Sequence, residues 1–281
     1  MARNRWTFMV ALMMVLAMVA AACSSDDGGD DTTTTEAAGG DETTTTEAME
    51  EAEEFKVAFV HVGPTEDKGW SWAHDQGAQY LEANMPGAVI TTLESIPEGP
   101  DSQRVFEDLA ADGNVLIFGT SFGYMDPMLA AADNFPDVAF LHATGYKTGP
   151  NMGNYFGAAE EGRYLSGMSA GARSESGKIG YVAAFPIPEV LRGINAFTLG
   201  VREMNPEATV QVVWTSTWFD PPTEGDAAQA LLDAGADVIA MHQDSSAPGQ
   251  AAEAAGAGWV GYNTDMSEFA PEGWLTAAIW D

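Results

Sequence analysis

Cysteine is nearly missing from this chain of 281 residues, in which Cys23 is the only one. A single cysteine excludes a disulfide framework and a zinc site built on several cysteines. Basic residues are also scarce, with 11 Lys and Arg against 42 Asp and Glu, and the formal net charge is −31. Nucleic acids bind to cationic surfaces, so this composition argues against a nucleic-acid partner.

Familiar catalytic and cofactor motifs are missing as well. The sequence has no GxSxG nucleophile elbow, and the glycines of Gly119–Gly123 lack the Lys and Ser/Thr of a phosphate loop. The four histidines show no local metal-ligand spacing. We therefore expect no metal, no cofactor and no catalysis. A secreted hydrolase on an α/β scaffold stays open as an alternative, because triads are not readable from spacing.

The chain does contain an uncharged run near its beginning. Arg3 and Arg5 precede Trp6–Ala22, which is short for a membrane span of ~20 residues and suits the apolar region of a signal peptide. Small residues stand directly before Cys23, as in a bacterial lipoprotein signal, which this segment resembles. The resemblance implies a signal peptide over residues 1–22 and lipidation of Cys23, which would hold the protein on the extracytoplasmic face of the cell membrane. A plain secretory signal and an uncleaved anchor helix are the alternatives.

Residues 23–54 form a segment of low complexity. Residues 24–54 hold 12 acids and no Lys or Arg, and TTTTEA occurs twice. Such a composition cannot bury enough apolar surface to offset the entropy lost on ordering. We therefore expect a disordered, charge-extended tether between the membrane and a folded part.

Apolar strand-like runs alternate with helix-length segments from Phe55 onward. The expected strands are 55–62, 88–93, 114–119, 138–142, 178–184, 209–215, 238–241, 258–261 and 275–280, and the expected helices are 72–85, 102–112, 126–135, 158–172, 187–204, 225–234 and 247–255. This alternation predicts an α/β fold with parallel sheets covered on both faces. We expect an N-terminal lobe (55–157), a helix and inter-lobe connection (158–177), a C-terminal lobe (178–273) and a return strand (274–281).

Candidate binding residues follow from the rule that ligands bind beyond the carboxyl ends of strands in open α/β sheets. The loops at those positions are rich in aromatic, hydroxyl, amide and carboxylate groups, which stack on flat rings and read their polar edges. Two lobes bearing such loops on facing ends describe a cleft that closes by hinge motion. The candidates are Trp70, Ser71, Ser121, Phe122, Tyr124, His142, Phe185, Trp218, Asp244 and Asn263.

Long motifs in the folded part resemble the basic membrane lipoprotein family. They include GPTEDKGWSWAHDQG (63–77), LIFGTSFGYMDP (116–127), EEGRYLSGMSAG (160–171), IGYVAAFPIPEVLRGINAFTLG (179–200) and WFDPPTEGDAAQALLDAGADVI (218–239). The resemblance covers about residues 55–281. It implies a substrate-binding lipoprotein of an ABC importer with the two-lobed type I periplasmic-binding-protein fold. The family continues beyond the position of Asp281, so the resemblance also implies that closing elements of the fold are missing.

The resemblance further implies a purine ligand, either a nucleoside or a free nucleobase. Trp70 takes the place of the family's stacking phenylalanine and Ser71 that of an asparagine, while His142 and Asn263 stand where nucleoside binders carry acids. Loss of those acids favours a free base such as adenine. The expected arrangement stacks Trp70 on one face of the ring and Phe185 or Trp218 on the other. His142, Asp244 and Asn263 would contact the polar edges, supported by Ser121 and Tyr124.

Two further functions are compatible with the same lobes. A ligand sensor would bind its ligand in the same way but signal to a membrane receptor instead of an ABC permease. A sugar-binding protein would use similar stacking tryptophans. The sequence leaves both open.

Overall fold

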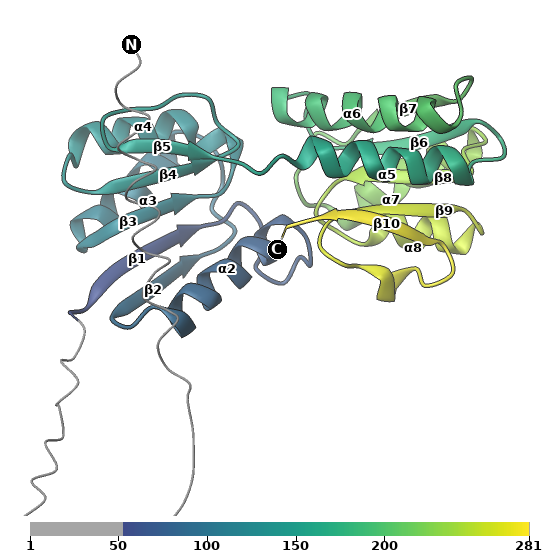
Figure 1. The fold of residues 1–281 in the computed structure, drawn as a ribbon. Coiled ribbons are helices and arrows are strands. Elements are labelled where there is room, and N and C mark those ends of the chain that lie inside the picture. Colours follow the sequence, from purple (N-terminus) through teal and green to yellow (C-terminus); the bar gives the residue numbers. More distant parts are fainter. Residues whose placement is uncertain (1–52, 281) are drawn as a thin grey trace, which may run out of the picture. The chain divides into compact units, whose positions relative to one another are not determined.

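The computed structural model describes residues 53–280, and they form two parallel sheets of five strands each (Figure 1). The first sheet has the order β2-β1-β3-β4-β5, from Ala88–Leu93, Phe55–Val60, Asn114–Gly119, Ala139–Ala143 and Met152–Tyr155. The second has the order β10-β9-β8-β6-β7, from Trp274–Ile279, Gly258–Asn263, Val238–His242, Lys178–Ala183 and Thr209–Trp214. The expected α/β architecture with two parallel sheets is confirmed.

Helices connect most of the successive parallel strands. The exceptions are β4 and β5, which a loop joins, and β9 and β10, which are joined by a loop with a 3₁₀ turn. In the first lobe the helices are α2 (Trp70–Asn84), α3 (Pro100–Ala111) and α4 (Met125–Asn134). In the second lobe they are α5 (Ala159–Arg173), α6 (Pro188–Met204), α7 (Pro221–Asp233) and α8 (Ala247–Ala254). Two short 3₁₀ turns, η1 (Phe122–Tyr124) and η2 (Ser267–Phe269), follow β3 and β9.

The central strands of the second sheet are buried on both faces. Every residue of β8 and β9 is buried, and adjacent residues belong to different cores. Trp259 packs with Leu231 of α7 in one core, while Val260 packs with Phe197 of α6 in the other. This is why the strands are continuous apolar runs without polar alternation.

The expected helix at 158–172 is α5, and it packs closely on α6. A Cβ atom on Gly167 would lie 2.0 Å from the carbonyl oxygen of Phe197, and one on Gly200 would lie 2.0 Å from that of Tyr164. Only glycine permits this approach of two helix backbones. The helix therefore lies against the second lobe, and the chain enters it from β5 through residues 156–158.

The expected signal peptide, Cys23 and the tether up to residue 52 lie outside the described residues. Among residues 53–280, no helix combines the length and the apolar content needed to cross a bilayer.

Candidate functional site

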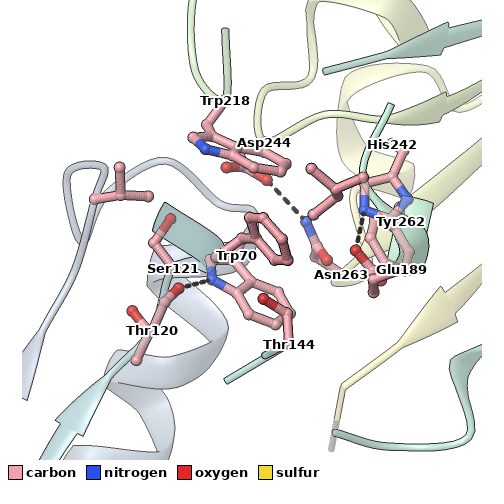
Figure 2. Close-up of a pocket in the computed structure, with 13 residues that line it drawn as sticks. Trp70, Thr120, Ser121, Thr144, Glu189, Trp218, His242, Asp244, Tyr262 and Asn263 are labelled. Atoms are coloured by element: carbon pink, nitrogen blue, oxygen red, sulfur yellow. Dashed lines mark hydrogen bonds and ion pairs between the residues drawn. The ribbon is translucent and has the colours of Figure 1, made fainter. Parts of the chain in front are cut away.

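A cavity lies at the carboxyl ends of strands from both sheets. Its volume is about 30 Å³, so the space between the lining side chains is narrow, and part of it is open to solvent. The first lobe contributes Val62, Trp70, Thr120, Ser121, Phe122 and Thr144, and the second contributes Ile187, Glu189, Trp218, His242, Asp244, Tyr262 and Asn263. Ten of these residues are labelled in Figure 2. The position agrees with the rule for open α/β sheets.

The loop before α2 fixes the aromatic wall of the first lobe. The carboxylate of Asp67 accepts hydrogen bonds from the backbone N–H groups of Gly69 (2.7 Å), Ser71 (3.0 Å) and Trp72 (2.9 Å). These donors are the free N–H groups of a helix start, and the carboxylate satisfies them. The loop thereby presents Trp70, whose Nε1 donates to the carbonyl oxygen of Thr120. This hydrogen bond fixes the half-buried indole by its Nε1 edge, and the ring lines the cavity (Figure 2).

A second tryptophan lines the cavity from the other lobe. Trp218 follows β7, and its ring lies 4.9 Å from that of Phe185 at an interplanar angle of 60°. Phe185 itself lines a neighbouring groove of about 380 Å³, which shares Val62 and Trp218 with the cavity. The cavity thus has indole side chains from both lobes, which suits a flat or weakly polar ligand.

Asp244 and Asn263 form a polar pair in the second lobe. Nδ2 of Asn263 donates to Oδ1 of Asp244 at 3.1 Å, while Oδ1 of Asn263 is buried and lacks a partner among the described residues. Burial raises the pKa of Asp244 well above its ordinary value, and the charges of Asp67 and Glu224 raise it further. Asp244 therefore favours its protonated form, which can donate as well as accept a hydrogen bond.

An ionic cluster forms another part of the second-lobe wall. Nε2 of His242 lies 3.2 Å from Oε2 of Glu189, and both side chains are almost fully buried. Arg163 reaches this pair from α5: its Nη2 donates to the carbonyl oxygen of Met241 at 2.8 Å and lies 3.5 Å from Nδ1 of His242. Its guanidinium stacks on Tyr262 at 3.6 Å from the ring centre.

The electrostatics keep Glu189 ionised. Burial by itself would raise the pKa of Glu189, but His242, Arg163 and Arg192 outweigh it, and the pKa lies below its ordinary value. Glu189 is therefore a buried carboxylate beside the cavity, and its pKa is shifted in the opposite direction to that of Asp244.

Six of the ten candidate residues line the cavity: Trp70, Ser121, Phe122, Trp218, Asp244 and Asn263. Ser71 lies buried near Asp67 and Gly63, and Tyr124 donates its hydroxyl to the carbonyl oxygen of Ile96. His142 donates from Nε2 to the carbonyl oxygen of Ser121 at 2.8 Å, so it supports a lining residue from behind. With Phe185 in the groove, these four stand outside the cavity wall.

Sequence reasoning did not select Glu189, His242, Tyr262 or Thr144. The last three stand at or just after strand ends, so the rule that found Asp244 could also have found them. Glu189 lies in the first turn of α6, so a search of the loops that follow strands does not select it. Among residues 53–280, no group of three or more His, Cys, Asp or Glu side chains is arranged to hold a metal ion.

Comparisons with known proteins agree with this geometry. Residues 55–281 match the family of PnrA-like ABC transporter substrate-binding proteins, Bmp. A protein of Haloferax volcanii named "Putative ABC transporter glucose-binding protein TsgA13" is 50% identical over 231 residues, which are 82% of this chain and 59% of that protein. A purine-binding protein of Brucella abortus is 46% identical over 233 residues, which are 83% of this chain and 67% of that protein. This chain thus spans about three fifths to two thirds of the length of these relatives.

Solved structures of substrate-binding proteins have the same fold. An ABC transporter solute-binding protein from Conexibacter woesei is 27% identical with a TM-score of 0.59, covering 76% of this chain and 71% of that one. A solute-binding protein from Aeropyrum pernix has a TM-score of 0.69 at 18% identity, covering 79% of this chain and 66% of that one. The fold is that of the type I periplasmic binding proteins.

Proposed function

Because the chain belongs to the Bmp family of ABC transporter substrate-binding proteins, we propose that it captures a purine nucleobase or nucleoside between its lobes. It then delivers the purine to the permease of an ABC importer. Closure of the lobes would bury the ligand, and the permease would recognise the closed form. No covalent step is required of the protein.

The observation that carries the purine proposal is the pair of tryptophans, one from each lobe, in a single cavity. Trp70 and Trp218 offer aromatic faces for a flat heterocycle, and stacking on such a face is worth about 1–3 kcal/mol per base. Asp244 and Asn263 supply donors and acceptors for the ring edge. The relative from Brucella abortus, which is named as purine-binding, supports the same ligand class.

Glucose or another sugar is the second candidate. Its support is the 50% identical relative from Haloferax volcanii, whose name gives glucose as the ligand. Tryptophan faces also stack on sugar rings, so the two indoles suit both ligand classes. The polar lining groups can likewise hydrogen-bond to hydroxyls.

Isothermal titration calorimetry on the full chain separates these candidates. The panel contains adenine, guanine, hypoxanthine, adenosine, inosine, glucose and several other sugars. Heat from a purine and none from the sugars supports the proposal, and the base or nucleoside that binds most tightly defines the cargo. Heat from a sugar and none from any purine overturns it. Release of free base from a nucleoside during the titration would show turnover and overturn the binding-only function.

We also propose that Cys23 carries a lipid that holds the protein at the extracytoplasmic face of the cell membrane. The support is the apolar run that ends in small residues before the only cysteine. Expression of the full chain and of Cys23→Ala in a bacterial host, followed by membrane fractionation, tests this. The wild type should sediment with membranes, and Cys23→Ala should lose lipid label and leave the membrane fraction. Equal labelling of both would contradict the anchor.

A further inference from the structure

Glu189 lies at the cavity wall with one carboxylate oxygen free. It stands in the first turn of α6, where the helix dipole favours a negative charge. Oε2 lies 3.2 Å from Nε2 of His242. Among residues 53–280, no protein group donates a hydrogen bond to Oε1, although Glu189 lines the cavity (Figure 2).

The positive charge of Arg163 favours the ionised form of Glu189. The side chain of Arg163 is 1% exposed, and its Nε and Nη1 atoms have no hydrogen-bond partner among the described residues. A buried guanidinium needs a nearby anion, and the lowered pKa of Glu189 reflects the attraction of His242 first and then that of Arg163 and Arg192.

The second lobe therefore offers the ligand two carboxyl groups with different properties. Glu189 is an anion and can only accept hydrogen bonds, whereas the buried Asp244 favours a protonated form that can donate. A ligand that fits both presents N–H donors to the first and an acceptor atom to the second. A nitrogen heterocycle carries both kinds of group on its edges.

We infer that Glu189 is a specificity-determining residue, whose carboxylate accepts hydrogen bonds from N–H groups of a nitrogen heterocycle bound in the cavity. This inference rests on the proposed purine-binding function and deepens it. His242 acts as a positioning residue, because its Nε2 lies 3.2 Å from the carboxylate, and the charge of Arg163 favours the ionised form of Glu189. Loss of one hydrogen bond to a charged acceptor should weaken binding about 10- to 100-fold.

The test compares ligands that differ in a single N–H group. Adenine is paired with unsubstituted purine, which lacks the exocyclic amine, and with 9-methyladenine, which lacks the ring N–H. Dissociation constants are measured for the wild type, Glu189→Gln and Glu189→Asp, with Glu203→Gln on an exposed position of the same helix as control. Glu189→Asp keeps the charge beside Arg163 and withdraws the carboxylate, so it guards against a loss of folding in Glu189→Gln.

We expect the wild type and Glu203→Gln to bind adenine at least tenfold more tightly than either unsubstituted purine or 9-methyladenine, depending on which N–H group Glu189 accepts. In the folded Glu189 variants this preference should fall to about threefold or less. A merely structural role would weaken all three ligands alike, so unchanged ratios in Glu189→Asp overturn the inference while purine binding by the wild type stands. Failure of the wild type to bind any of these heterocycles, with binding of a sugar, overturns the proposed function itself.

Discussion

Gly69 of the first lobe lies against the backbone of Asp244 in the second. A Cβ atom on Gly69 would lie 2.4 Å from the carbonyl oxygen of Asp244 and 2.6 Å from its Cα. Beside this contact, the hydroxyl of Thr264 donates to the carbonyl oxygen of Lys68. The loop that presents Trp70 therefore docks on the loop that carries Asp244, and glycine is what permits the approach.

Gly69→Ala should weaken ligand binding without unfolding either lobe. The added methyl group has to push the two loops apart, which opposes the arrangement that closes the cavity. We expect at least a tenfold increase in the dissociation constant, about 1.4 kcal/mol. Calorimetry with the preferred ligand measures it.

Gly77→Ala is the matched control, because a Cβ at Gly77 of α2 meets nothing within 4 Å. It should bind as the wild type does and should gain about 1 kcal/mol of stability from helix propensity. Wild-type affinity in Gly69→Ala would show that the contact does not matter for binding.

Trp70→Ala should abolish or strongly weaken binding while the fold is retained. The half-buried indole supplies a stacking face, and its loss should cost about 1–3 kcal/mol of binding free energy. Trp72→Ala, two residues along, is the control, since Trp72 does not line the cavity and instead lies 5.3 Å from the ammonium group of Lys68. Titration of both variants, with circular dichroism to check folding, decides the point. Equal affinities would mean that Trp70 only packs.

The fold was largely predictable because its central strands are continuous apolar runs. Val238–Met241 is one of them and is buried throughout, and the helix-length spacers between such runs predict parallel pairing. The strand Met152–Tyr155 was not predicted, since its four residues, MGNY, include glycine and asparagine. It forms because its backbone pairs in parallel with the edge of β4, and this pairing depends on the tertiary fold and not on the local sequence.

The binding site was only partly predictable, because the end of a strand does not fix where a side chain points. Asp244 and Asn263 face the cavity, whereas His142, at a similar position in the first lobe, points to the backbone of Ser121. Glu189 shows a different limit. Its charge depends on His242 at the end of β8 and on Arg163 in another helix, and no local sequence pattern records that arrangement.

Glu224→Ala should destabilise the second lobe by about 2–4 kcal/mol. This buried carboxylate accepts hydrogen bonds from the backbone N–H of Asp220 (2.9 Å) and from the N–H (3.1 Å) and hydroxyl (2.5 Å) of Ser245. Alanine would leave these donors unsatisfied, at about 1–3 kcal/mol each before relaxation. Urea unfolding measures the change, and Asp226→Ala, at an exposed position of the same helix, should stay within about 0.5 kcal/mol. If Glu224→Ala loses no more unfolding free energy than Asp226→Ala, water must accept the hydrogen bonds in place of the carboxylate.

His61 should make the protein less stable as the pH falls from 6.5 to 4. The ring is 0% exposed, and its Nδ1 lies 2.9 Å from the hydroxyl oxygen of Thr120, which itself donates to the carbonyl of Val60. Its Nε2 is buried without a partner among the described residues. Burial lowers the pKa of His61 from 6.5 to about 4, and the charge of Glu94 offsets this only in part. Between these values the unfolded chain binds a proton that the folded protein does not.

The contribution of His61 is therefore complete above pH 6.5 and is lost progressively down to pH 4, about 3 kcal/mol in all. Urea unfolding at pH 7.0 and 4.5 measures the change in the free energy of unfolding. His61→Asn is the comparison, because the carboxyl groups and His74 titrate in both proteins and only the titration of His61 is removed. The wild type should lose about 2–3 kcal/mol more than His61→Asn over this interval. Parallel profiles for the two proteins would mean that His61 takes up its proton in the folded state at an ordinary pKa.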